Sequence, residues 1–434
     1  MPRRSVESVL EIAAVVLIAL AALTASAKWI ITGQNPLGQE AAPAPQRLEN
    51  IEKPAPKVRL GIDNIDDYAD VFKGKRVGLI TNQTGIASDF RTTVDILREK
   101  TNLVALYAPE HGVWGDKPAG AGIGTYIDQR TGLTVYSLYG KTKKPTPEML
   151  ANIDVLAYDI QDVGARPYTY MYTMAYAMQS CKEQGKTFVV FDRPNPLGGR
   201  EVEGNLVEPG YESFIGMYPI PQRYGLTIGE IARLFNDYFG IGCNLVVVPM
   251  RGWKRDMYFS DTGLPWVMPS PNIPTPETAL LYNATGIFGG TNVSEGVGTT
   301  RPFEYVGAPW IDPFAFAARM NALNLPGVYF RPAYFTPAFF RYQGQVCGGV
   351  QIHVTDRRAF RPVRTGLSLL YTVRRLSGDK FQFTPGRPRP NIDLVTGCSY
   401  IREGSLSLEE VISRWDREAA KFKEMSQKYY LYQD

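Results

Sequence analysis

The most regular feature of the chain between residues 75 and 250 is a series of short apolar runs separated by more polar segments. Three of the intervening stretches, residues 92–100, 168–183 and 227–239, favour helices. Strands that are apolar on both faces and alternate with helices predict a mainly parallel, doubly wound, Rossmann-like sheet with helices on each side. The predicted strands are residues 77–80, 103–107, 134–138, 155–158, 187–191 and 245–248.

A second region begins near residue 265 with a Pro-rich stretch and has a different pattern. Residues 347–354 alternate as a strand, and we expect its His353 to lie in the core or to support the site from behind. Residues 363–376 and 408–430 favour helices. Ser407 with Glu410 three residues on has the spacing of a capping box. We therefore predict a Rossmann-like catalytic domain over residues 58–264 and a smaller α+β domain over residues 265–434 that closes a cleft.

The N-terminal residues have the pattern of an export segment. Arg3 and Arg4 precede an apolar run that ends in Ala25-Ser26-Ala27, as in a signal peptide over residues 1–27. Acidic residues at positions 7 and 11 weaken the basic start, so an uncleaved membrane anchor is the alternative. Residues 28–57 are rich in Ala, Pro, Gln and Glu and predict a flexible linker. We expect an exported protein, periplasmic or secreted, of undetermined oligomeric state.

Composition narrows the classes of function. The 434 residues carry a net charge of only +4, because basic and acidic residues are nearly balanced. This charge is too small for nucleic-acid binding driven by bulk charge. The two histidines, His111 and His353, exclude a three-histidine metal site within one chain, and we expect no metal. No phosphate loop of the form G-x-x-x-x-G-K-[ST] occurs, so a nucleotide-dependent enzyme is disfavoured and no cofactor is expected. The four cysteines lack C-x-x-C spacing, although export would permit a Cys347–Cys398 disulfide.

Polar side chains follow four of the predicted strands. The carboxyl ends of parallel strands share one edge of a sheet, where ligands bind in this architecture. Glu110 lies between Pro109 and Gly112, so its loop is restricted, and a partly desolvated carboxyl there suits general-acid chemistry, with His111 orienting its proton. The alternative is an ordinary polar loop. The polar residues at this edge are Asn82, Glu110, His111, Asp159, Asp162, Asp192, Arg193 and Asn195.

The loop after residues 155–158 has two interpretations. Asp159 and Asp162 could bind sugar hydroxyls or supply a second carboxylate. Equally, Asp162 and Arg166 could form a structural ion pair. Tyr168 begins a run of alternating tyrosines on a helix, where only one or two of them can face a cleft.

Two further loops carry candidate binding groups. Arg193 could hold a substrate carboxylate, whereas Asp192 and Asn195 could equally stabilise a turn. Asn292 and Glu295 lie in a Gly-rich loop of the second region and could reach the cleft from the other side.

Five motifs together resemble the exo-β-N-acetylmuramidase family, a glycoside hydrolase family formerly known as a domain of unknown function. The resemblance extends from about Leu60 to the C-terminus. It implies removal of terminal β-1,4-linked N-acetylmuramic acid from the non-reducing ends of peptidoglycan fragments, in a cleft between a Rossmann-like and a smaller domain. The motifs are TNQTG (81–85), APEHG (108–112), DIQDVGAR (159–166), DRPNPLGG (192–199) and GTNVSEG (290–296).

The resemblance also suggests residue roles. Glu110 takes the place of the catalytic acid with His111 beside it, and the loop of Asn292 and Glu295 would line the same pocket. The second catalytic group stays open between Glu295, an Asp, and the 2-acetamido group of the substrate. The family often carries a basic residue where this chain has Val297; Arg166, Arg193 or Arg301 could substitute for it. A non-catalytic peptidoglycan-binding protein is the alternative function.

Overall fold

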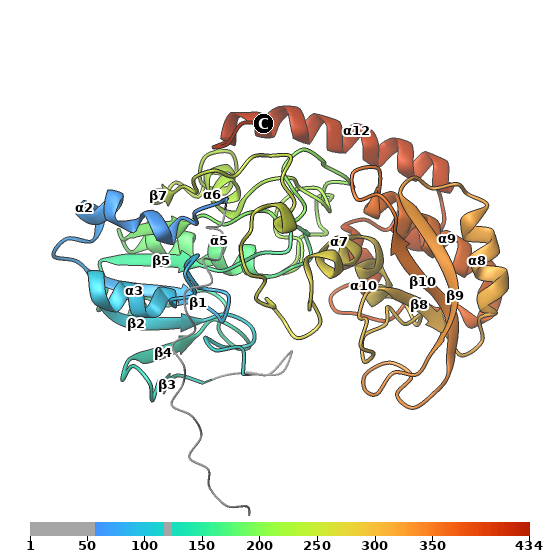
Figure 1. Ribbon diagram of the computed structural model, residues 1–434, viewed down its shortest axis with the longest axis horizontal. Helices are drawn as coiled ribbons and strands as arrows, with labels where there is room; N and C mark the ends of the chain where they lie inside the picture. Colours follow the sequence, from blue (N-terminus) through green and yellow to red (C-terminus); the bar gives the residue numbers. More distant parts are fainter. Residues whose placement is uncertain (1–56, 117–123) are drawn as a thin grey trace, which may run out of the picture. The chain divides into compact units, whose positions relative to one another are not determined.

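A seven-stranded sheet forms the framework of the first half of the protein. The computed structural model describes residues 57–116 and 124–434. The strands are β1 (Arg76–Thr81), β2 (Asn102–Ala108), β3 (Tyr126–Ile127), β4 (Thr134–Ser137), β5 (Val155–Asp159), β6 (Thr187–Phe191) and β7 (Asn244–Val248). Their order is β3-β4-β2-β1-β5-β6-β7, and every neighbouring pair is parallel except β3–β4 (Figure 1). The predicted doubly wound, mainly parallel sheet is confirmed.

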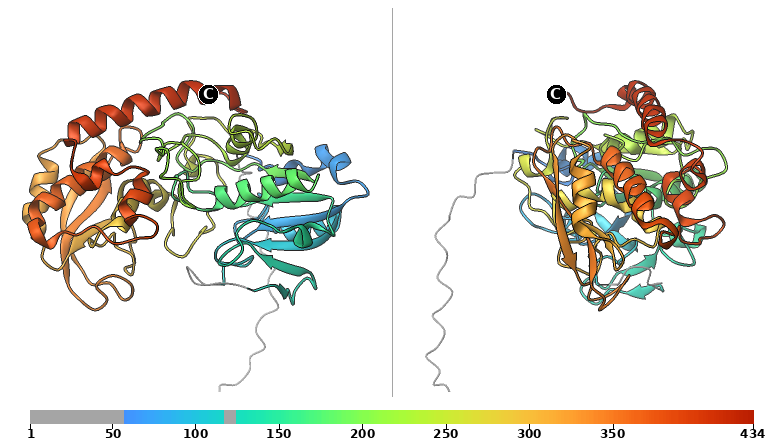
Figure 2. Two further views of the ribbon diagram at one scale, coloured as in Figure 1. Left: turned by 180° about the vertical axis from the view of Figure 1, so that it is seen from behind. Right: turned by 90° about the vertical axis from the view of Figure 1, so that its right-hand side faces the viewer.

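Helices cover both faces of this sheet. On one face α3 (Thr93–Lys100), the 3-10 helix η1 (Ile62–Tyr68) and α2 (Ala69–Phe72) share a core with Leu79 of β1. On the other face α5 (Tyr170–Glu183) and α6 (Ile228–Asp237) share a core with Ile80, the next residue of β1. Figure 1 shows α3 in front of the sheet, and the reverse view in Figure 2 shows α5. The strands are apolar on both faces because both faces are covered.

The second half has a smaller sheet and its own core. Its three strands, β8 (Tyr305–Ala308), β9 (Val328–Phe335) and β10 (Cys347–Val354), pair antiparallel in the order β8-β10-β9. The helices of this half are α7 (Pro276–Thr285), α8 (Pro313–Asn321), α9 (Pro362–Ser377), α10 (Asn391–Thr396) and α11 (Tyr400–Glu403). Side chains of these strands and helices form one continuous apolar cluster. The predicted smaller α+β domain is confirmed.

The C-terminal segment returns to the first half. Helix α12 (Leu408–Ser426) begins at the predicted capping box of Ser407 and Glu410, and η5 (Gln427–Tyr429) follows it. Phe422 and Tyr429 belong to the core that α5 and α6 form on the large sheet. Beyond them, the Tyr432 hydroxyl accepts a 2.8 Å hydrogen bond from the backbone N–H of Met250 in the first half.

Several expectations fall outside the described residues or need correction. The predicted export segment (1–27) and all but the last residue of the predicted linker (28–57) lie outside the described part of the chain. Within residues 57–116 and 124–434, no helix is both long and apolar enough to cross a membrane. All four cysteines are buried free thiols, so Cys347 and Cys398 form no disulfide. The prediction that His353 lies in the core is wrong: it pairs with Tyr329, which is 52% exposed, on the solvent face of the small sheet.

Candidate active site

Glu110 stands in a tight turn at the carboxyl end of β2. The N–H of Gly112 donates a 3.1 Å hydrogen bond to the carbonyl of Pro109, and His111 (φ 73°) and Gly112 (φ 83°) both have left-handed backbone. A non-glycine residue in this region is strained, so surrounding contacts must hold it. Glu110 is half-buried, and its Oε2 accepts a 3.3 Å hydrogen bond from the hydroxyl of Thr169. The turn presents the Glu110 carboxyl at the ligand-binding edge of the sheet.

Three of the predicted carboxyl groups act electrostatically on one tyrosine, Tyr282 of α7. Burial raises the pKa of Tyr282, and the charges of Glu110, Asp162 and Glu295 raise it further. Because charge interactions weaken with distance, the Tyr282 hydroxyl lies within electrostatic range of all three carboxyls. The fold therefore places Glu110, Asp162 and Glu295, here called the carboxyl cluster, within electrostatic range of Tyr282. Tyr168 packs edge-on against the ring of the same tyrosine, with ring centroids 6.0 Å apart.

Aromatic and amide groups lie beside Glu110. Burial raises the pKa of the Tyr170 hydroxyl, and the charge of Glu110 raises it further. A hydrogen bond with Asn82 lowers the same pKa. Burial also raises the pKa of Tyr139 to about 12, with a further contribution from Glu110. Tyr168 and Tyr170 pack edge-on at 5.0 Å. Asn82 and Tyr170 therefore lie beside Glu110.

Asp162 is a fully buried carboxyl whose two oxygens have different surroundings. Its Oδ1 accepts hydrogen bonds from the N–H groups of Val163 (2.8 Å) and Gly164 (3.0 Å) and from the hydroxyl of Tyr224 (2.7 Å). Its Oδ2 is buried and accepts no hydrogen bond from any described residue. Burial raises the pKa of Asp162 to about 6. Buried polar atoms are almost always satisfied, so Oδ2 is a natural acceptor for a ligand hydroxyl.

Glu295 is held by an arginine that the sequence did not point to. Arg341 donates from Nη1 to Glu295 Oε2 at 2.6 Å and to the carbonyls of Val293 (2.5 Å) and Phe288 (3.3 Å). Burial raises the pKa of the Glu295 carboxyl, and the charge of Arg341 works against that rise. The carboxyl is therefore fixed in place by its partner and by the loop backbone.

Asn292, in the same loop, has its side chain engaged elsewhere. Its Nδ2 donates to the carbonyl of Lys380 at 2.8 Å, and its Oδ1 accepts from the N–H of Gln382 at 2.9 Å. Both amide groups bind backbone, so the side chain fastens the loop to a neighbouring segment. This differs from the expected substrate contact.

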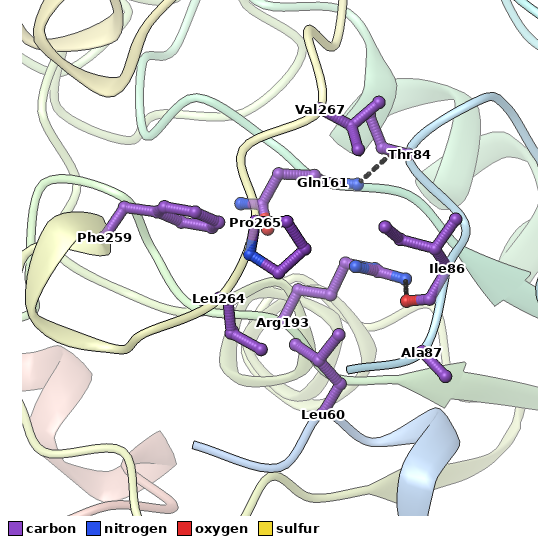
Figure 3. A pocket seen from close by; sticks show the side chains of 10 residues that line it. All are labelled: Leu60, Thr84, Ile86, Ala87, Gln161, Arg193, Phe259, Leu264, Pro265 and Val267. Atoms are coloured by element: carbon purple, nitrogen blue, oxygen red, sulfur yellow. Dashed lines mark hydrogen bonds between the residues drawn. The ribbon is translucent and has the colours of Figure 1, made fainter. Parts of the chain in front are cut away.

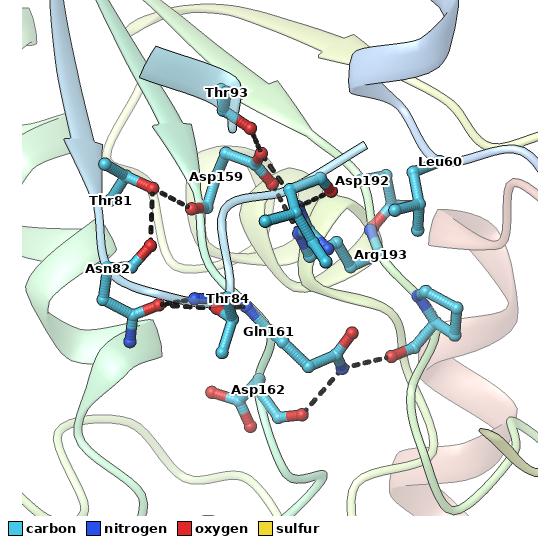
Figure 4. Close-up of polar contacts among 12 residues, drawn as sticks. Leu60, Thr81, Asn82, Thr84, Thr93, Asp159, Gln161, Asp162, Asp192 and Arg193 are labelled. Carbon is cyan, nitrogen blue, oxygen red and sulfur yellow. Dashed lines mark hydrogen bonds and ion pairs between the residues drawn. The ribbon is translucent and has the colours of Figure 1, made fainter. Parts of the chain in front are cut away.

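Asp159 and Arg193 pair with each other beneath the site. Arg193 donates from Nε to Asp159 Oδ1 at 2.5 Å and from Nη2 to Oδ2 at 2.9 Å, and Thr93 also donates to Oδ2 (Figure 4). Burial raises the pKa of Asp159, which Arg193 opposes. The cavity beside Arg193 measures about 10 Å³, too small for a sugar ring (Figure 3). Asp159 and Arg193 are therefore engaged in a buried ion pair, and the contact of either with substrate stays a prediction.

The Asp192 carboxyl binds groups of the protein itself, including Tyr432 of the C-terminal segment. Its Oδ1 accepts from the N–H of Gly229 at 2.7 Å, and its Oδ2 accepts from the hydroxyls of Thr227 (2.8 Å) and Tyr432 (2.6 Å). Asp192 is fully buried, and burial raises its pKa to about 7. These contacts favour the structural interpretation over a role at the substrate.

Arg166 and Asn195 also bind the protein's own backbone. Arg166 is fully buried and donates to the carbonyls of Asn205 (2.5 Å) and Thr396 (2.9 Å), so Asp162 is not its partner. Asn195 donates from Nδ2 to the carbonyl of Leu226 at 2.9 Å. Both side chains shape the loops that carry the site.

A separate cavity of about 520 Å³ lies on another face of α7. Pro276 and Leu280 of α7 line it together with Arg357 and with Arg301, one of the arginines suggested as a substitute for a basic residue at 297. The side chains of Glu110, Asp162 and Glu295 do not line it. Leu280 and Tyr282 are about 200° apart around a helix, so this cavity and the carboxyl cluster occupy different sides of α7.

The clustered carboxyls do not form a metal site. Among the described residues, no group of three or more His, Cys, Asp or Glu side chains is placed to hold a metal ion.

Comparison with known families covers nearly all of the described chain. Residues 77–277 match the family described as exo-β-N-acetylmuramidase NamZ, N-terminal, and residues 280–432 match its C-terminal counterpart. The chain belongs to the exo-β-N-acetylmuramidase family. The prediction that it is a glycosidase of this family is therefore confirmed.

Relatives of this exo-β-N-acetylmuramidase family extend over most of the chain. Peptidoglycan β-N-acetylmuramidase NamZ of Bacillus subtilis is 51% identical over 398 residues, which cover 90% of this chain and 95% of the relative. A crystal structure of a DUF1343 family protein from Bacteroides fragilis is similar, with a TM-score of 0.81 and 44% identity over 88% of this chain and all of that one. A second crystal structure from that organism has a TM-score of 0.70 and 31% identity, covering 87% of this chain and 99% of that one.

Two residues of the site gave no signal in the sequence. Tyr282 lies on a short helix whose start follows a Pro-rich stretch, and Arg341 lies in the connection between β9 and β10. Neither belongs to a polar cluster after a strand of the large sheet. Both residues come from the second half of the chain, so their place in the site depends on tertiary contacts that no local sequence pattern predicts.

Proposed function

We propose that this chain releases terminal β-1,4-linked N-acetylmuramic acid from the non-reducing ends of peptidoglycan-derived saccharides, and that Glu110 protonates the glycosidic oxygen. The observation that carries the proposal is the position of Glu110: a half-buried carboxyl in a tight turn at the ligand-binding edge of the sheet, where it accepts a hydrogen bond from Thr169. Asp162 and Glu295 act electrostatically on the same tyrosine, Tyr282, as Glu110 does. The name of the Bacillus subtilis relative supports the same substrate class.

The second group is Glu295, Asp162 or the acetamido group of the substrate. Asp159 is less suited because its carboxylate already binds Arg193 and Thr93. A carboxyl partner acting as nucleophile gives retention of configuration, and one acting as base through a water gives inversion. Proton NMR of the sugar first released distinguishes the two outcomes. Retention without a trappable enzyme-bound sugar would indicate the acetamido group.

The activity is tested by product analysis on a defined disaccharide in which N-acetylmuramic acid is β-1,4-linked to N-acetylglucosamine. We expect free N-acetylmuramic acid and N-acetylglucosamine in equal amounts. A matched disaccharide with the two sugars in reverse order should not be cleaved. A longer chain should lose sugar only from its non-reducing end, and release of internal fragments would contradict exo action.

We further propose that residues 1–27 direct export. The support is the basic start, the apolar run and the Ala25-Ser26-Ala27 end of this segment. Fractionation of expressing cells with mass analysis of the product tests this: a mature chain that starts at Lys28 indicates cleavage, and a full-length membrane-bound chain indicates an anchor. Full-length protein in the cytosol would contradict export.

A further inference from the structure

An N-acetylmuramic acid substrate brings its own negative charge to an acidic site. Its lactyl carboxylate would enter a cluster that already holds Glu110, Asp162 and Glu295. Like charges at short range repel, so binding needs a positive group close to that carboxylate. Val297, which directly follows the Ser-Glu-Gly of the Glu295 loop, is 7% exposed and belongs to the apolar core of the second half, so this position supplies no charge. The cation must therefore come from elsewhere in the chain.

The arginines that the sequence suggested are otherwise engaged. Arg166 is buried and donates to backbone carbonyls. Arg193 is buried and binds the carboxylate of Asp159. The side chain of Arg301 is 58% exposed, approaches Glu304 at 3.3 Å, and lines the cavity on the other side of α7. None of these three contacts a member of the carboxyl cluster.

We propose that Arg341 binds the lactyl carboxylate and thereby selects the substrate. All its hydrogen bonds to described residues come from Nη1, including the 2.6 Å bond to Glu295, and none comes from Nε or Nη2. The side chain is 17% exposed, so Arg341 is not sealed in the interior. Two parallel N–H groups match the geometry of a carboxylate.

The loop around Arg341 holds the guanidinium in place before substrate arrives. Its Cζ lies 5.5 Å from the ring centroid of Phe340, a cation–π contact. The following residue, Tyr342, donates from its hydroxyl to the carbonyl of Asn292 at 2.5 Å and so ties this loop to the loop of Glu295. A guanidinium held on one edge loses little freedom when the other edge binds an anion.

This inference rests on the proposed function, because it assumes a muramic acid substrate. Its test compares two para-nitrophenyl glycosides: β-N-acetylmuramide, and the same compound with the lactyl carboxyl converted to a primary amide. For Arg341→Gln we expect kcat/KM on the acid to fall roughly 10- to 100-fold, mainly through KM, as for loss of a charged hydrogen bond. The fall in kcat/KM on the amide should be smaller by a factor of about 10 or more, because a loss that acts through Glu295 is common to both compounds. Arg341→Lys keeps the charge and should retain part of the preference for the acid.

Arg301→Gln is the matched control and should leave both values unchanged. Equal losses on both compounds in Arg341→Gln would mean that Arg341 only holds Glu295, and would overturn the proposal. A loss of preference in Arg301→Gln instead would also overturn it. Circular dichroism shows whether Arg341→Gln folds. If it does not, Arg341→Lys is the deciding variant: a reduced preference for the acid over the amide supports the proposal, and an unchanged preference overturns it.

Binding measurements separate this inference from the proposed function. If the wild-type protein turns over neither compound, the proposed function fails. Calorimetry with free N-acetylmuramic acid and its lactyl amide then tests Arg341 alone. Tighter binding of the acid by the wild type, lost in Arg341→Gln, supports the proposal. Equal binding of acid and amide by the wild type would overturn it.

Discussion

Arg193 and Asp159 form a buried ion pair at the carboxyl end of β5, in which two nitrogens of the guanidinium bind both oxygens of the carboxylate at 2.5 and 2.9 Å. Arg193 also donates to the carbonyl of Ile86 at 2.7 Å. The pair therefore ties together the end of β5 and the loops that follow β1 and β6. Those segments carry the site, so the pair supports its geometry.

Breaking this ion pair should destabilise the protein. We expect Arg193→Met to lower the free energy of unfolding by about 3–5 kcal/mol, because it leaves the Asp159 carboxylate buried without its partner. Urea unfolding measures the change. Arg301→Met, at an exposed position, is the control and should stay within about 0.5 kcal/mol of the wild type. Unchanged stability in Arg193→Met, with a raised KM, would instead place Arg193 at the substrate.

Asp162 should matter more for activity than for stability. In Asp162→Asn the side-chain oxygen can keep the bonds from Val163, Gly164 and Tyr224, so we expect unfolding to change by less than about 1 kcal/mol. The free acceptor Oδ2 becomes a donor, so kcat/KM for muramide hydrolysis should fall by roughly 10- to 100-fold. Steady-state kinetics and urea unfolding on the same preparation check both values. Wild-type kcat/KM in the variant would exclude Asp162 from the site.

Asp192 should make stability depend on pH. Burial raises its folded-state pKa to about 7, whereas an unfolded chain titrates near about 3.9. Between these values the folded state holds a proton that the unfolded state has released, so stability falls as pH rises from about 4 to about 7 and levels off above that. The slope for this group is at most about 1.4 kcal/mol per pH unit.

Asp192→Asn removes this contribution. We expect the stability of the variant relative to the wild type to increase from pH 5 to pH 8, measured by urea unfolding at both values. Its Asn side chain can still meet the Thr227 and Tyr432 hydroxyls and the Gly229 N–H. Stability that falls in parallel for both proteins would show that Asp192 is ionised throughout.

The sequence predicted the large sheet well because its signal is local. Runs such as 187–191 are apolar on both faces, and the structure has β6 at the same residues. The edge strand β3 was missed because two residues carry no periodicity. His353 was misplaced because alternation indicates a two-faced strand but does not say which face is covered; the face it shares with Tyr329 is open to solvent.

The site was predictable in part for a related reason. Glu110, Asn82 and Asp162 follow strands of one parallel sheet, so topology alone places them at one edge. The same rule also predicted Asp159, Asp192 and Arg193 as site residues. It does not distinguish side chains that face a ligand from side chains that bind other protein groups below the surface. Tyr282 and Arg341 come from the second half, and no local pattern reports contacts across the two halves.

The most direct test of the central claim is the initial rate of N-acetylmuramic acid release by Glu110→Gln. The control is Glu148→Gln, in the short helix α4 (Pro147–Leu150). We predict that Glu110→Gln folds as the wild type does, by circular dichroism and thermal unfolding. Its kcat on the disaccharide should fall by roughly 100- to 10,000-fold, as expected for loss of a general acid, and Glu148→Gln should be unaffected. The para-nitrophenyl muramide should lose less, because its leaving group needs little protonation. Wild-type disaccharide turnover by a folded Glu110→Gln protein would contradict the assignment of Glu110 as the acid.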